Sequence, residues 1–486
     1  MLGKIIDKYK TIPVQVRASL WFLICTFLQK GISLITTPIF TRILTTSEYG
    51  KYSVFNSWLS IITVFVSLNL YSGVYTQGMV KFEGERKQYA SSLQGLCLTL
   101  VVAWTIIYLI FHDWLNNLFE LTTVQMLAML LMIWTTACFN FWSVEQRIDF
   151  KYSKLVLITL LVSIAKPVLG VFLVLNSTDK VTARILGLLL VEVVAYTGLF
   201  AVQMYRGRKF CVRKFWKYAL LFNLPLLPHY LSTSVLSSAD RIMIGYMVGE
   251  DAAGIYNLAY SVSLIMTMFN TALIQTVEPW LYKKIKAGEI AGISKIAYPT
   301  FIIIAGVNVI LIAFAPEIIA IFAPIEYMDA IWVIPPIAMS VFFMFAYTFF
   351  AVFEFYFEKT HYITFATVAG AVLNIVLNYH AIRIWGYYAA GYTTLLCYVI
   401  YAILHYYFMK KICKEYLNGA EAYNDKILLI ITVVFMAIAF AFLITYRDVV
   451  VRYLLILVFT TILIVKRKII VLAIKNLISI KKRTDF

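Results

Sequence analysis

Three basic residues of this 486-residue chain lie inside long apolar stretches, where a charge is costly. Lys30 and Lys166 fall near the middle of their stretches, and Arg241 falls in the outer half of its own. A charged side chain at the centre of a bilayer costs about 2.5–3.5 kcal/mol, so it normally faces a cavity or a partner. Ammonium and guanidinium groups around one cavity would bind phosphate or pyrophosphate oxygens. These residues are therefore candidate ligands of a phosphorylated substrate.

Two carboxylates, Asp240 and Glu192, lie in the same apolar zone and offer a second interpretation. Arg241 could pair with either of them in a structural contact, and the lysines could meet backbone carbonyls. Asp240 and Glu192 are thus structural or ion-coupling candidates. Lys30 and Lys166 have no carboxylate on their own helices, which favours substrate binding for these two.

Amide side chains inside the apolar stretches are a further set of candidate ligands. Asn56, Asn140 and Asn257 are the three that we select. An amide both donates and accepts hydrogen bonds, which the recognition of sugar hydroxyls requires. Hydrogen bonds between neighbouring helices are the alternative use of such residues, and the commoner one for any single amide.

The composition indicates which elements hold these residues. Hydrophobic residues make up 62% of the sequence and charged residues 14%, and the mean hydropathy is +0.83. Soluble domains have about 45–50% apolar and about 25% charged residues, so lipid must surround most of this chain. The net charge of +17 comes from basic residues in short loops. Without a basic, aromatic-interleaved domain, it gives no indication of nucleic-acid binding.

Apolar stretches of 17 or more residues predict an all-α membrane protein with about fourteen transmembrane helices. Pro225 and Pro228 predict a bend near the start of the seventh helix. A last stretch, 469–480, is too short to span and has the pattern of an interfacial amphipathic helix. The predicted spans are approximately 18–40, 52–74, 90–112, 124–144, 155–175, 185–204, 218–247, 253–275, 297–315, 330–353, 362–382, 388–409, 427–446 and 450–465.

The distribution of Lys and Arg predicts the orientation of these helices. With the N-terminus in the cytoplasm, the cytoplasmic segments carry 32 of the 42 basic residues and the outer segments carry 7. Basic residues accumulate on the cytoplasmic side of membrane proteins. We therefore expect a multi-pass protein of the cytoplasmic membrane with both termini in the cytoplasm.

A weak internal repeat predicts how the helices are grouped. Gly50-Lys51-Tyr52 opens the second span, and Gly254-Ile255-Tyr256 opens the eighth. Six spans separate the copies, as in transporters whose halves are parallel repeats. We expect two six-helix lobes plus two C-terminal helices, with an N-terminal lobe over residues 1–210, a C-terminal lobe over 211–412, and spans 13–14 with a basic tail over 413–486.

Other chemistries have little support in the sequence. The six cysteines show no CxxC spacing, the five histidines are dispersed, and no phosphate-binding loop or nucleophile motif is present. We expect no metal, no cofactor and no catalytic residue, and a transporter rather than an enzyme.

Three stretches carry a family resemblance: Thr37-Pro38-Ile39-Phe40-Thr41-Arg42-Ile43-Leu44-Thr45, Lys81-Phe82-Glu83-Gly84-Glu85-Arg86 and Ser238-Ala239-Asp240-Arg241-Ile242-Met243-Ile244-Gly245. They resemble the polysaccharide-exporter branch of the multidrug/oligosaccharidyl-lipid/polysaccharide (MOP) flippase superfamily, the Wzx-type O-antigen and capsule flippases. The resemblance implies alternating access and a central cavity that takes a polyprenyl-pyrophosphate oligosaccharide across the membrane. It also implies that basic cavity residues meet the pyrophosphate.

The resemblance implies as partners a lipid-linked oligosaccharide and membrane lipids, with the polysaccharide polymerase and chain-length machinery as further candidates, and no nucleic acid. A peptidoglycan-precursor flippase is one alternative, because its substrate has the same anionic head. A cation-coupled multidrug exporter would need buried carboxylates, whereas the central charges here are positive. A membrane sugar polymerase or ligase is an alternative of another class, and it would need a larger outer loop than this sequence has.

Overall fold

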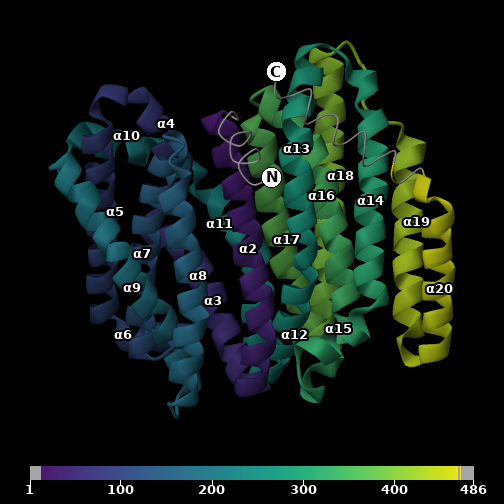
Figure 1. Cartoon of the computed structure of the whole chain (residues 1–486), viewed down its shortest axis with the longest axis horizontal. Coiled ribbons are helices and arrows are strands. Elements are labelled where there is room, and N and C mark those ends of the chain that lie inside the picture. Colours follow the sequence, from purple (N-terminus) through teal and green to yellow (C-terminus); the bar gives the residue numbers. More distant parts are fainter. Residues whose placement is uncertain (1–12, 469–470, 472–486) are drawn as a thin grey trace, which may run out of the picture. The chain divides into compact units, whose positions relative to one another are not determined.

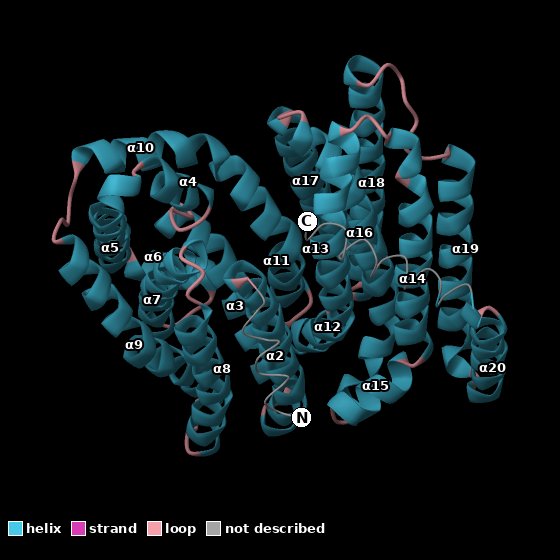
Figure 2. Ribbon diagram, turned by 45° about the horizontal axis from the view of Figure 1, so that its top comes forward, coloured by secondary structure: helices cyan, strands magenta, loops and turns pink. Residues whose placement is uncertain are grey.

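The computed structural model describes residues 13–468 and residue 471, and all of its regular elements are helices (Figure 2). The chain divides into two compact units, which we call the N-terminal unit, ending at Ser238, and the C-terminal unit, beginning at Ala239. The division falls within α11. The expected lobe limits at residues 210 and 412 stay a prediction about the functional halves. The predicted amphipathic helix at 469–480 lies outside the described residues, apart from residue 471.

The N-terminal unit contains α2 (Val14–Ile43), α3 (Thr46–Ser67), α4 (Gly73–Lys81), α5 (Arg86–Ile110), α6 (His112–Phe119), α7 (Thr123–Ile148), α8 (Tyr152–Leu175), α9 (Lys180–Gly207), α10 (Arg213–Asn223) and the start of α11 (Leu227–Met247) (Figure 1). The C-terminal unit contains the rest of α11, α12 (Glu250–Ser263), α13 (Ile265–Lys286), α14 (Ser294–Ala313), α15 (Ala315–Phe322), α16 (Ile334–Tyr356), α17 (Thr360–Trp385), α18 (Tyr388–Tyr416), α19 (Asp425–Ile444) and α20 (Val449–Val465). Short 3₁₀ turns cover Glu83–Glu85, Leu224–Leu226, Ile290–Gly292, Ile325–Trp332 and Thr445–Arg447.

The predicted all-α membrane fold is confirmed. Twelve helical segments among the described residues are long and apolar enough to cross a membrane. The other two predicted spans correspond to α3, whose 22 residues are more polar, and to α20, which is apolar but has only 17 residues. Each of the fourteen apolar stretches is therefore helical over most of its length.

Local sequence signals explain where several helices begin and break. Thr45 and Glu48 form a capping box at the start of α3, in which each side chain accepts the backbone N–H of the other residue. The predicted bend in the seventh span is confirmed: α10 ends at Asn223, and a 3₁₀ turn that contains Pro225 precedes α11. Proline removes a backbone donor and clashes with the preceding turn, so the helix cannot continue straight.

The N-terminal unit is held by both apolar and polar packing. Phe82 and Tyr89 pack against Phe215 with ring centroids 5.0 and 5.3 Å away, which joins α10 to α5. Gln94 on α5 donates to Gln203 on α9 at 2.7 Å, and Gln203 donates to Glu145 on α7 at 2.7 Å. Hydrogen bonds between helices replace the hydrophobic driving force that lipid removes.

Helix α16 forms the core of the C-terminal unit, because most of its residues are buried. It packs most extensively against α18, and also against α12, α13 and α14. Helices α19 and α20 lie at one edge of this unit (Figures 1 and 2). Arg452 on α20 forms an ion pair with Glu317 on α15, and the Tyr446 hydroxyl donates to the carbonyl of Ile312, so polar contacts attach this edge.

Candidate anion-binding site of the N-terminal unit

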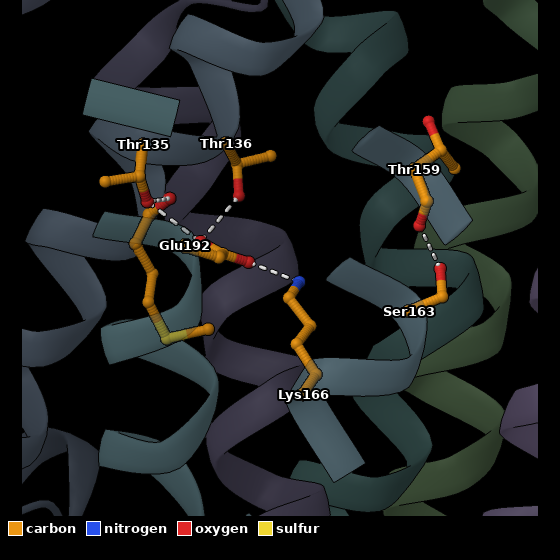
Figure 3. Close-up of polar contacts among 7 residues, drawn as sticks. Thr135, Thr136, Thr159, Ser163, Lys166 and Glu192 are labelled. Atoms are coloured by element: carbon orange, nitrogen blue, oxygen red, sulfur yellow. Dashed lines mark hydrogen bonds and ion pairs between the residues drawn. The ribbon is translucent and has the colours of Figure 1, made fainter. Parts of the chain in front are cut away.

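Lys166 and Glu192 form an ion pair between α8 and α9. The Lys166 Nζ lies 2.6 Å from Glu192 Oε1 (Figure 3). The Lys166 side chain is 27% exposed, whereas that of Glu192 is 4% exposed. Lys166 thus has the more accessible side chain of the pair, and Glu192 has the more deeply buried one.

Two consecutive threonines hold Glu192 from the other side. The hydroxyls of Thr135 and Thr136 on α7 donate to Glu192 Oε2 at 2.8 and 3.3 Å (Figure 3). A carboxylate can accept several hydrogen bonds, so both of its oxygens are satisfied without water. Helix α7 therefore fixes the position of Glu192, and Glu192 fixes that of the Lys166 head.

Two glycines explain why α8 and α9 approach closely enough for this pair. A Cβ atom on Gly187 would lie only 2.9 Å from the Cα of Gly170. Gly170 is one turn beyond Lys166 on α8, and Gly187 is five residues before Glu192 on α9. Small residues let helix backbones touch in membrane proteins. The contact brings the two charged side chains within reach of each other.

Lys30 lies on α2, which packs against α8. Trp21 stacks on Tyr152 with centroids 6.4 Å apart, and a Cβ atom on Gly170 would lie 3.2 Å from the Phe40 ring. The two helices therefore run in the same direction. At a rise of 1.5 Å per residue, Lys30 and Lys166 are offset by roughly 8 Å along the bundle. Lys30 is partly exposed, and it forms no ion pair or hydrogen bond with any described residue.

Arg241 and Asp240 belong to the C-terminal unit, where both are buried. The Arg241 guanidinium lies over the Tyr260 ring, 4.1 Å from its centroid, and Asp240 accepts a hydrogen bond from the Tyr256 hydroxyl. Glu192, which the sequence analysis offered as one carboxylate partner of Arg241, is bonded to Lys166 of its own unit. Helix α12 supplies aromatic partners to both charged residues, and their roles as binding and coupling candidates stay predictions.

The three amides have different surroundings. Asn56 on α3 donates to the carbonyl of Tyr52 at 2.9 Å, which is a contact within its own helix. Asn140 on α7 and Asn257 on α12 are partly exposed and form no hydrogen bond with another described residue. Asn140 belongs to the N-terminal unit, as Lys30 and Lys166 do, whereas Asn257 belongs to the C-terminal unit.

Two charged sites were missed by sequence reasoning. Arg184 directly precedes the predicted sixth span, 185–204, and so was expected in an outer loop. It lies in α9 and is buried between the rings of Tyr52 and Phe40, 3.5 and 3.9 Å from their centroids. Glu354 and His405 form a buried pair between α16 and α18. The Gly-x-Tyr motif that contains Tyr52 was visible, but its arginine partner is far away in sequence.

The comparison that decides the family covers more than half of the chain. The sequence model of a family described as polysaccharide biosynthesis protein matches residues 16–285. The chain belongs to this polysaccharide biosynthesis family. Two relatives come from Haemophilus influenzae: a protein of the Lsg locus, 23% identical over 284 residues, and an uncharacterized membrane protein, 22% identical over 274. The matches cover 55% and 54% of this chain and 66% and 63% of the relatives.

Solved structures show that this family member has the fold of MOP superfamily transporters. The lipid II flippase MurJ in an inward closed conformation matches with a TM-score of 0.67 and 15% identity, over 93% of this chain and 99% of MurJ. An inward-facing multidrug resistance MATE transporter matches with a TM-score of 0.60 and 15% identity, over 81% and 96%. A MOP transporter from Pyrococcus furiosus, described by a reverse polarity of its binding pocket, matches at 0.54 and 14%, over 84% and 96%.

Proposed function

We propose that this chain is a flippase that moves a polyprenyl-pyrophosphate-linked oligosaccharide across the cytoplasmic membrane, for capsule, O-antigen or exopolysaccharide synthesis. The observation that carries the proposal is the arrangement of Lys30, Lys166 and Glu192 in the N-terminal unit. The side chains of both lysines are partly exposed, and the only carboxylate bonded to either of them among the described residues is the more deeply buried Glu192. Such a site favours an anion over a cation.

The charges at this site fit a pyrophosphate diester. The two lysines and Glu192 sum to one positive charge, so a dianionic head group is attracted and partly neutralised. Lys30 can bind the head group directly. Lys166 can do so by leaving Glu192, whose carboxylate keeps the hydroxyls of Thr135 and Thr136. The offset of roughly 8 Å between the lysines along the bundle suits an extended head group of phosphates and sugar.

The family and the fold support the same function at a coarser level. Membership in a polysaccharide biosynthesis family favours a glycan cargo. MurJ, which shares the fold, is described as a lipid II flippase, and lipid-linked cargo is thus compatible with this architecture. The excess of accessible cations disfavours the export of cationic drugs, although MATE transporters share the fold too.

Deletion of the gene tests the cargo class. We expect a polyprenyl-linked oligosaccharide to accumulate in the inner leaflet, and the wild-type gene to clear it. If no lipid-linked sugar accumulates, the flippase assignment is wrong.

Lys30→Gln tests the site without leaving a buried charge unpaired. We expect this variant to leave the lipid-linked sugar uncleared while the protein level in the membrane stays normal, and Lys30→Arg to clear it. Lys151→Gln is the matched control, because Lys151 also lies in the N-terminal unit and its side chain is 65% exposed beside Asp149. Normal clearance by Lys30→Gln would remove Lys30 from the site.

A further inference from the structure

A second pair of titratable side chains is buried in the C-terminal unit, and the function proposed above does not use it. The Nδ1 atom of His405 on α18 lies 2.7 Å from Oε1 of Glu354 on α16, and both side chains have an exposed fraction of 0%. Helices α16 and α18 lie side by side in this unit (Figure 1). The pair thus sits in the most extensive helix contact of the unit.

One polar atom on each side chain of this pair has no hydrogen-bond partner among the described residues. Glu354 Oε2 and His405 Nε2 are both buried, and neither forms a hydrogen bond with another described residue. A buried polar atom without a partner costs about 1–3 kcal/mol. Apolar residues of similar volume would often serve stability as well or better than a buried ion pair. Packing alone therefore gives no reason for two incompletely bonded titratable groups.

Aromatic rings enclose the pair. Tyr347 on α16 stacks on the His405 ring at 5.3 Å, and Tyr401 on α18 meets it edge-on at 4.5 Å. His361 at the start of α17 is a further ionisable side chain that interacts with Glu354 electrostatically. No other ionisable side chain of the described residues, whether from α12, α13, α14 or α19, forms a hydrogen bond or ion pair with Glu354 or His405.

The net charge of the pair depends on how many protons it holds. With a single proton, in the Nδ1–H···Oε1 hydrogen bond, a neutral imidazole faces a carboxylate and the pair carries one negative charge. A second proton, on His405 Nε2 or on the carboxyl group, brings the net charge to zero. A low-dielectric interior favours the neutral form. Release of that proton needs access to water, and Glu354 lies only two residues before the end of α16.

We propose that Glu354 and His405 form a proton-binding site, loaded when buried and emptied when α16 and α18 open to water, which couples transport to the proton gradient. The proposal rests on the proposed function for its transport step, but the binding of the proton does not. Because a hydrogen bond joins the two groups in one site, a single proton is bound and released per cycle.

Reconstitution in proteoliposomes tests the coupling, with a polyprenyl pyrophosphate carrying a fluorescent sugar as the probe. A pH difference of one unit should drive about tenfold accumulation by the wild type if one proton moves per cycle. We expect Glu354→Gln and His405→Gln to abolish this accumulation while exchange of the probe without a gradient stays within about twofold of wild type. Asp425→Asn is the control, because Asp425 pairs with Lys410 at the surface.

Proton uptake by the purified protein near neutral pH separates this proposal from the proposed function. We expect Glu354→Gln to bind about one proton fewer per molecule than the wild type, because a second proton would leave a net positive charge on a buried imidazole. Unchanged uptake, or accumulation that does not depend on the gradient, would overturn the proton site while leaving the flippase in place. Loss of exchange in a variant that unfolds like the wild type would also overturn it. If the wild-type protein moves no probe but still takes up more protons than the variant, the proposed flippase function is wrong and the proton-binding site stands.

Discussion

Gly187 and Gly170 bring the backbones of α9 and α8 into direct contact, one turn from the ion pair between Lys166 and Glu192. A Cβ atom on Gly187 would meet the Gly170 Cα at 2.9 Å and its N at 3.1 Å. Backbone atoms cannot rotate away as a flexible side chain can, so the helices would have to separate. The geometry of the charged site therefore depends on two residues that carry no charge.

Gly187→Ala should destabilise the protein by about 1–3 kcal/mol, as overpacking of a tight contact does. It should also reduce transport, because the helix shift weakens the Lys166–Glu192 pair. Thermal unfolding in detergent and the clearance of lipid-linked sugar measure the two effects. Gly198→Ala on the same helix is the matched control, because no atom lies within 4 Å of its added Cβ. Equal unfolding temperatures for the two variants would contradict the prediction.

Lys166→Met should cost about 3 kcal/mol of stability, because it leaves the buried Glu192 carboxylate without its cation. Lys166→Met combined with Glu192→Gln removes both charges and should recover most of that loss. The double-mutant cycle measures their coupling. Transport should stay low in the double variant, because the ammonium is missing. Recovery of transport together with stability would show that the pair is structural only.

Arg452→Leu should loosen the attachment of α19 and α20. Its guanidinium, 4% exposed as a side chain, pairs with Glu317, which also accepts from the Tyr453 hydroxyl at 2.8 Å. We expect the stability of this region to fall by about 1–3 kcal/mol, because leucine cannot replace the ion pair that Arg452 makes with the Glu317 carboxylate. Hydrogen exchange of α19 and α20 should rise in this variant and stay normal in Arg447→Leu, whose side chain is exposed. Equal exchange in the two variants would argue against this attachment.

Cys211 offers a direct test of the predicted orientation. It is the one exposed cysteine among the six, all of which lie in the described part of the chain, and it sits in the loop between α9 and α10. We expect that loop to face the cytoplasm. A membrane-impermeant maleimide should label inside-out vesicles and leave intact cells unlabelled, and Cys211→Ser should remove the label. Labelling of intact cells would reverse the orientation.

Hydropathy predicted the helices well because each span is a local property of the chain. Every predicted stretch is helical over most of its length. Pro225 marks the break before α11. Partners across helices are not a local property. Glu192 is 26 residues from Lys166, and we had considered it a partner for Arg241.

The partners of the other charged residues could not be predicted for the same reason, because they lie on other helices. Arg184 seemed to lie in an outer loop, because its charge shortened the apparent apolar stretch, but aromatic rings from α2 and α3 cover it inside α9. Helix α2 carries no carboxylate, and Lys30 forms no ion pair or hydrogen bond with any described residue. Its role in binding stays a prediction.

The deep burial of α16 has a consequence for the order in which the chain is made. Ribosomes release α16 before α17, α18 and α19, so the side of α16 that packs against α18 is completed last. Glu354 has to remain without its histidine until 51 further residues have been synthesised. The contact that completes the core of the C-terminal unit therefore forms only after most of α18 has been made.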